Sequence, residues 1–129
     1  MGNQFLSIAA QSDALLHVVD ASGGIDSTGK ITEVGTGDPI SDFEDIEEEL
    51  IMWYHKILEG NRDKISKLIK TGTDISDALT DLYRGIGVTK IHVKETFHAT
   101  NLEEKDFDDF NMVDTKILHL ILEKFQNLR

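Results

Sequence analysis

One apolar segment constrains the fold of this chain more than any other. Residues 14–20 read Ala-Leu-Leu-His-Val-Val-Asp, a near-continuous apolar run with paired valines. This pattern is typical of a β-strand buried on both faces of a parallel sheet, but the chain contains no second run like it. A lone buried strand cannot satisfy its own backbone N–H and C=O groups. The segment therefore either pairs with structure outside this chain or is not a strand here.

The segment 41–60 gives the strongest helix prediction. Ser41 and Glu44 have the spacing of a capping box, which begins a helix. Six of the eight residues 42–49 are acidic, which suits the positive end of a helix dipole. Gly60 is a natural stop. Apolar side chains recur along one face at steps of three and four: Phe43, Ile46, Leu50, Trp53 and Ile57.

Shorter helices are predicted on both sides of this one, beginning near residues 3, 61, 74 or 76, 89, and 111 or 114. Residues 102–110 are predicted to form a short acidic turn or helix. Residues 21–39 are rich in Gly, Ser, Thr and Asp, which predicts an extended loop with a short hairpin around 30–34. The whole pattern predicts a mainly α chain with one strand, an unbalanced α/β fragment.

Charge and composition narrow the function classes. The 129-residue chain has a formal net charge of −11, which argues against a direct grip on nucleic acid and against binding to an anionic membrane surface. It contains no cysteine, so disulfides and thiolate metal sites are excluded, in keeping with a cytoplasmic protein. No apolar run is long enough to predict a membrane span.

The stretch Gly-Ile-Asp-Ser-Thr-Gly-Lys at 24–30 matches most of a phosphate-binding loop. Such a loop needs a Ser or Thr directly after its lysine and a helix that begins there. Ile31 follows Lys30, and the next residues are too rich in Gly and β-branched residues for a stable helix. We therefore interpret Gly24, Gly29 and Lys30 as turn residues and expect no nucleotide-binding residue in this chain.

No other constellation predicts catalysis or metal binding. The five histidines include no pair at the three- or four-residue spacing of a helical metal site, and the acidic run lacks the pattern of a calcium loop. No Gly-x-Ser-x-Gly motif is present. We expect no catalytic residue and no metal ligand. Trp53 and Tyr54 either pack in the core or form an aromatic patch that faces a partner.

Several segments resemble a known family. Residues 13–23 (Asp-Ala-Leu-Leu-His-Val-Val-Asp-Ala-Ser-Gly), 37–40 (Gly-Asp-Pro-Ile) and 49–54 (Glu-Leu-Ile-Met-Trp-Tyr) resemble the archaeal branch of the Obg-like (YchF-type) GTP-binding proteins. Gly2 and Asn3 resemble the tail of the family's switch II region. Residues 82–89 and 92–95 are similar to its helical insertion, so the resemblance covers nearly the whole chain and is most specific over the first 58 residues.

The resemblance implies a division of the chain into three parts. Residues 1–40 would be part of a GTPase domain, 41–110 the helical insertion, and 111–129 a helix that returns to the GTPase domain. The strand at 14–20 would belong to a parallel sheet whose other strands are absent. The family's phosphate-binding loop would lie upstream of this chain, and its Asn-Lys-x-Asp base-reading motif downstream.

The resemblance also implies a function for the whole protein. It would hydrolyse GTP or ATP, with Mg²⁺, in association with the ribosome or the translation machinery, whereas this chain alone would have no cofactor and little or no activity. Its immediate partner would be the rest of the GTPase domain. The preference between GTP and ATP stays open, because the base-reading residues are absent.

A second hypothesis is a stand-alone acidic helical module that binds proteins without catalysis. In that case residues 14–20 must be sheltered within the chain, against the apolar faces of the helices that begin near Ser41 and Asp114. An unpaired strand and unmatched apolar faces also predict a tendency to self-associate.

Overall fold

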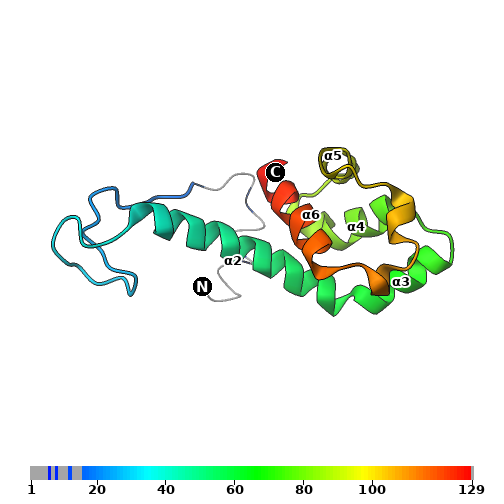
Figure 1. The fold of residues 1–129 in the computed structure, drawn as a ribbon, viewed down its shortest axis with the longest axis horizontal. Helices are drawn as coiled ribbons and strands as arrows, with labels where there is room; N and C mark the ends of the chain where they lie inside the picture. Colours follow the sequence, from blue (N-terminus) through cyan, green and yellow to red (C-terminus); the bar gives the residue numbers. More distant parts are fainter. Residues whose placement is uncertain (1–5, 7, 9–11, 13–15, 129) are drawn as a thin grey trace.

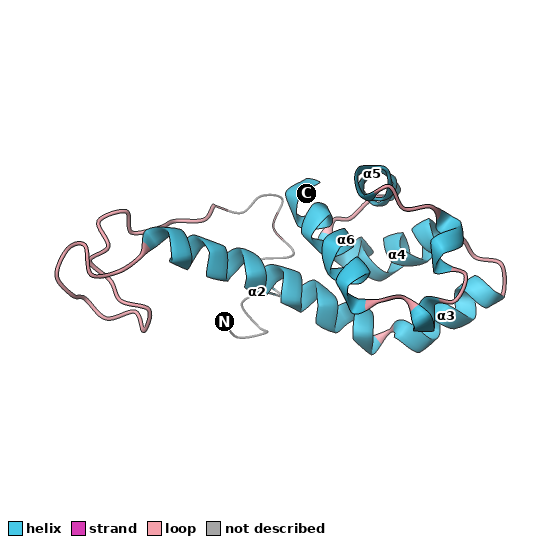
Figure 2. Cartoon of the chain, in the orientation of Figure 1, coloured by secondary structure: helices cyan, strands magenta, loops and turns pink. Residues whose placement is uncertain are grey.

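The computed structural model describes residues 6, 8, 12 and 16–128 of the chain. Every named element in this described part is a helix, as Figure 2 shows, and the prediction of a mainly α chain is confirmed. One long helix carries an extended loop at one end and a compact group of helices at the other (Figure 1). Gly2, Asn3 and most of the helix predicted near residue 3 lie outside the described residues.

The long helix α2 spans Pro39–Gly60. Its N-cap is Asp38, whose carboxylate accepts hydrogen bonds from the backbone N–H groups of Ile40 and Ser41 at 3.1 and 3.2 Å. The predicted capping box at Ser41 is therefore wrong by one turn. Pro39 explains the earlier start, because its ring presets a helical φ and its missing N–H costs nothing at the first helical position.

Two short helices follow without a side-chain cap. Helix α3 spans Arg62–Lys70 and helix α4 spans Ile75–Tyr83, continued by the 3₁₀ turn η1 (Arg84–Ile86). Asn61 precedes α3, but its side-chain amide donates to the carbonyl of Ile57 at 2.8 Å. It therefore closes the end of α2 and does not cap α3 as the sequence predicts.

Helix α5 (Lys90–Thr100) has a true capping box. The Thr89 hydroxyl accepts from the His92 backbone N–H, and His92 Nδ1 accepts from the Thr89 N–H. Two 3₁₀ turns, η2 (Glu104–Phe107) and η3 (Phe110–Met112), lead to helix α6 (Thr115–Leu128). Asp114 precedes α6, and its carboxylate accepts from the Lys116 N–H at 2.8 Å.

The hydrophobic core lies at the helical end of the molecule. It joins the C-terminal half of α2 to α3, α4, α5, α6 and the turns between them. Its largest fully buried side chains are aromatic: Tyr54, Tyr83, Phe107 and Phe110. The Tyr83 hydroxyl donates to the Tyr54 carbonyl at 2.8 Å, so its polar atom has a partner, and burial raises the pKa of Tyr83.

The predicted buried strand is not formed by the described residues 16–20. Leu16 and Val18 are 94 % and 89 % exposed, because no neighbouring strand in the described part of the chain offers its backbone groups for pairing. The hairpin predicted around 30–34 is displaced: a single antiparallel bridge joins Ile25 to Ile31. The apolar run is visible in the sequence, but its pattern does not show whether partner strands are present.

Helix α6 belongs to the same core as α4 and α5. Leu118, Ile121 and Leu122 are buried there, and α6 packs against both α5 and α2. The three-part division at residues 40 and 110 stays a prediction. Among the helices of the described residues, none combines the length and the apolar character that crossing a membrane requires.

Candidate functional site

The loop that resembles a phosphate-binding loop is organised by two aspartates. Asp20 Oδ1 accepts hydrogen bonds from the Ser22 N–H and hydroxyl at 3.0 and 2.6 Å, and Oδ2 accepts from the Gly24 N–H at 2.9 Å. The bond from the Ser22 hydroxyl is the main reason that the pKa of Asp20 lies below its usual value. The first amide of the motif, at Gly24, is thus already paired with a carboxylate.

Asp26 organises the second half of the motif in the same way. Its Oδ1 accepts from the Thr28 hydroxyl at 2.7 Å, the Thr28 N–H at 2.9 Å and the Lys30 N–H at 3.0 Å. These bonds, the hydroxyl first, lower the pKa of Asp26. Gly29 is at φ +82° and its N–H donates to the Asp26 carbonyl. The Lys30 side chain is exposed, and no helix begins at Lys30.

Two glycines let the loop fold back on itself. The Gly37 N–H donates to the Gly23 carbonyl at 2.8 Å. A Cβ on Gly37 would lie 2.1 Å from the Ile25 carbonyl oxygen, and one on Gly23 would lie 2.7 Å from the Gly37 oxygen. Gly23 is also at φ +61°, where glycine avoids the strain that other residues meet. The loop is therefore a self-contained turn structure.

The two candidate partner-facing aromatics separate in the structure. Tyr54 is 1 % exposed and meets Tyr83 edge-on in the core, with ring centroids 5.9 Å apart. The partner-patch interpretation is thus wrong for Tyr54, because its position on α2 points into the helical core. Trp53 is only half-buried and lines a groove of about 400 Å³ with Met52 and Glu48, among others. For Trp53 a partner-facing role stays a prediction.

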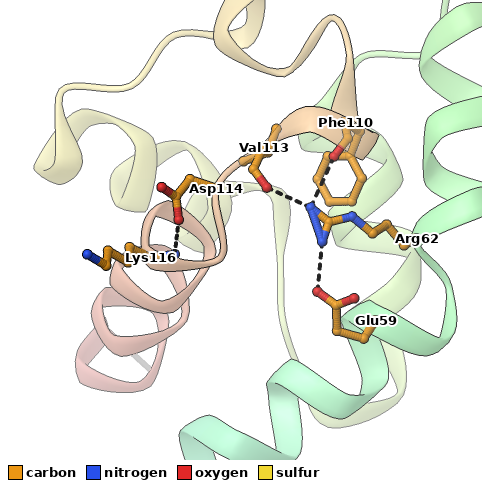
Figure 3. Close-up of polar contacts among 6 residues, drawn as sticks. All are labelled: Glu59, Arg62, Phe110, Val113, Asp114 and Lys116. Atoms are coloured by element: carbon orange, nitrogen blue, oxygen red, sulfur yellow. Dashed lines mark hydrogen bonds and ion pairs between the residues drawn. The ribbon is translucent and has the colours of Figure 1, made fainter.

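Arg62 ties the start of α3 to the segment before α6, as Figure 3 shows. Its Nη2 donates to the Val113 carbonyl at 2.6 Å and to the Phe110 carbonyl at 3.4 Å, while Nη1 pairs with Glu59 Oε1 at 2.9 Å. The guanidinium carbon lies 5.6 Å from the centre of the Phe110 ring, within the range of a cation–π contact. Sequence reasoning missed this contact, because the partners are about fifty residues apart.

Two histidines face each other between α2 and α6. The rings of His55 and His119 are stacked with centroids 5.8 Å apart, and His119 Nε2 lies 4.0 Å from Glu48 Oε2. Burial lowers the pKa of His55, and the neighbouring His119 lowers it further; Arg62 acts in the same direction, while Glu59 and Glu48 oppose it. No group of three or more His, Cys, Asp or Glu in the described residues could hold a metal ion.

Because the pKa of His55 is lower in the folded state than its ordinary value of 6.5, the unfolded chain takes up more protons as the pH falls. Folding stability is therefore lost below about pH 6.5. We expect the urea concentration at the unfolding midpoint to be lower at pH 5.5 than at pH 7.5. His55→Gln should reduce this difference between the two midpoints. His98→Gln, on an exposed position of α5, should leave the difference as it is. An equal effect of the two substitutions would contradict the assignment to His55.

Comparisons with known proteins agree on one class. A crystal structure of a GTP-binding protein from Pyrococcus horikoshii OT3 superposes with a TM-score of 0.82 and 32 % sequence identity, over 95 % of this chain and 34 % of that one. A GTP-binding protein of Methanocaldococcus jannaschii is 37 % identical over 94 residues, which are 73 % of this chain and 23 % of the relative. No family model matches the chain. The fold and the sequence thus define part of a GTP-binding protein.

The family can be named more closely. The ribosome-binding ATPase YchF of Bacillus subtilis is 44 % identical over 71 residues, 54 % of this chain and 18 % of that protein. The chain belongs to the family of GTP-binding proteins that includes YchF, as its resemblance to the Obg-like proteins predicts. It spans about a quarter or less of the length of these two relatives.

Proposed function

We propose that this chain is the helical, partner-facing part of a translation-associated protein that hydrolyses GTP or ATP, and that the hydrolytic machinery lies outside it. The observation that carries the proposal is the match to the P. horikoshii GTP-binding protein, which extends over 95 % of this chain but only 34 % of that one. A relative named as a ribosome-binding ATPase supports the link to translation. The nucleotide, with Mg²⁺, would be a cofactor of the whole protein.

The geometry of the 24–30 loop supports the absence of phosphate binding. A phosphate-binding loop directs free backbone N–H groups at the anion, but here the amides of Gly24, Thr28 and Lys30 already bond to Asp20 and Asp26. A phosphate at this place would have to displace a carboxylate and would be repelled by it. The loop also lacks a hydroxyl next to Lys30 for Mg²⁺ and a following helix N-terminus.

The exposed apolar residues favour this proposal over a stand-alone helical module. In a stand-alone module, the run at 14–20 should be covered by the faces of α2 and α6. Instead, Leu16 and Val18 are almost fully exposed, and Ile31 and Val34 of the following loop are 91 % and 77 % exposed. We infer that the rest of a GTPase sheet covers this surface in the cytoplasmic protein, and that the isolated chain self-associates through it.

Calorimetric titration with GTP, GDP and ATP in the presence of Mg²⁺ tests the absence of nucleotide binding. We expect no binding heat from the purified chain, and none from Lys30→Ala or the matched control Lys94→Ala. Micromolar binding that Lys30→Ala abolishes and Lys94→Ala retains would overturn the proposal, because it would make the 24–30 loop a working phosphate site.

A further inference from the structure

The charge of this acidic chain is unevenly distributed. Three lysines of α3, Lys64, Lys67 and Lys70, are all exposed, although the net charge of the chain is −11. The acidic run at 42–49 lies in the other half of α2, away from α3, as Figure 1 shows. We call the three side chains the lysine stripe of α3.

The stripe is unpaired within the part of the chain that the structure describes. The ion pairs found there use other cations: Arg62 with Glu59, Arg84 with Asp81, Lys90 with Asp77, and Lys105 with Glu103. None of them involves a lysine of the stripe. The three ammonium groups are therefore available to an external anion without loss of an internal contact.

The three lysines share one side of the helix. At about 1.5 Å rise and 3.6 residues per turn, Lys64 and Lys70 are separated by roughly 9 Å along the axis, and the stripe covers an arc of about 120°. The helix dipole explains why lysines stand at positions 67 and 70, since cations are favourable in the last turn of a helix. The dipole does not explain Lys64, which lies in the first turn, where a cation is unfavourable.

The acidic run does not cancel the stripe. Glu49 precedes the end of α2 by roughly 16 Å along the helix axis, at about 1.5 Å per residue. This distance exceeds the Debye length of about 8 Å at physiological ionic strength. Glu59 is nearer but is paired with Arg62. Asp63 is then the one acidic residue on α3 itself.

The net charge of the chain argues against binding to nucleic acid, but it does not describe the local charge of α3. We propose that the lysine stripe of α3 binds the sugar–phosphate backbone of RNA. The choice of RNA among polyanions rests on the proposed association with the translation machinery. Three cations on one side of a helix can contact neighbouring phosphates of a nucleic-acid strand, and such contacts position a protein without reading sequence.

The face is less suited to a protein or a membrane. The centre of a protein–protein interface is depleted in lysine and enriched in aromatic residues, and none of the large exposed apolar side chains found in the described residues lies on α3. Binding of a helix to a membrane surface also needs an apolar face that can enter the lipid. The buried residues of α3 instead turn toward the protein, as Ile65 does at 2 % exposure.

Anisotropy of a labelled single-stranded RNA, titrated with the 129-residue chain without nucleotide, tests the proposal. Three phosphate contacts predict a slope of log K against log[salt] of about −2, at about −0.7 per contact. Raising the salt from 50 to 200 mM should therefore weaken binding about 15-fold. The variant in which Lys64, Lys67 and Lys70 are all replaced by Gln should lose the salt-dependent binding, and the corresponding triple Arg variant should keep it.

A control variant with Gln at Lys30, Lys94 and Lys116 changes the net charge equally at exposed positions on other elements. It should bind RNA like the unmodified chain, and circular dichroism should show that all three variants are folded. Equal loss in the control, no RNA binding at 50 mM salt, or equally tight binding of polyglutamate would overturn the proposal. Because no nucleotide is added, these results are independent of whether the 24–30 loop binds GTP.

Discussion

Replacing Phe107 by alanine is expected to lower the free energy of unfolding by about 3–5 kcal/mol, the usual cost of removing a buried aromatic ring. Phe107 is 1 % exposed, and its ring stacks on Phe97 with centroids 5.1 Å apart and lies 6.5 Å from the ring of Phe110. It thus joins α5 to both 3₁₀ turns before α6. Since small domains have total stabilities of about 5–15 kcal/mol, the variant should be partly unfolded at 37 °C.

Urea denaturation followed by circular dichroism at 25 °C measures this loss. Phe43→Ala makes the same chemical change at a side chain that is 45 % exposed and stacks on His17 in the loop, with centroids 5.0 Å apart. It should cost about 1 kcal/mol or less. Similar losses in the two variants would mean that η2 is not an integral part of the core.

Helix positions are predictable here because apolar periodicity is a local property. The stripe of α2 and the apolar residues of α4, α5 and α6 all lie on helices in the structure. The caps are less predictable, since several side chains compete for the same backbone groups. Asp38 caps α2 in place of Ser41, because Pro39 fixes the first turn, and Asn61 turns back to the end of α2.

The apolar run at 14–20 shows the opposite case. Its pattern is that of a buried strand, and such a strand exists only where other strands accept its hydrogen bonds. In this chain Leu16 and Val18 are exposed, so the described residues do not provide the environment that the pattern indicates. The family resemblance implies neighbouring strands for this run, whereas periodicity alone does not.

The candidate site also has features that the local sequence predicts and features that it does not. The prediction that Gly24–Lys30 is no phosphate loop rests on the residue after Lys30 and on the poor helix that follows. The sequence could not show that the carboxylates of Asp20 and Asp26 accept hydrogen bonds from the backbone amides of this loop. Hydrogen bonds within a loop depend on its backbone path. The position of Tyr54 in the core and the contacts of Arg62 likewise depend on how distant helices pack.

Arg62→Ala is expected to lower the free energy of unfolding by about 2–3 kcal/mol. The substitution leaves the carbonyls of Phe110 and Val113 without their charged donor, and hydrogen bonds to charged groups contribute about 1.5–3 kcal/mol. The pair with Glu59 adds little, since Glu59 is 46 % exposed and exposed pairs are worth about 0–1 kcal/mol. The same urea measurement applies, and amide hydrogen exchange should show faster opening of α6.

Arg62 stands at the first position of α3, where a cation opposes the helix dipole; its contacts with the segment before α6 explain why it is there. Arg62→Lys keeps the charge but not the planar fork that reaches two carbonyls and stacks on Phe110, so it should recover only part of the stability. Arg84→Ala removes an arginine that forms an exposed pair with Asp81 and should cost less than 1 kcal/mol. If Arg62→Lys were as stable as the unmodified chain, charge alone would hold α6 in place, and the geometry of the guanidinium group would be irrelevant to the fold.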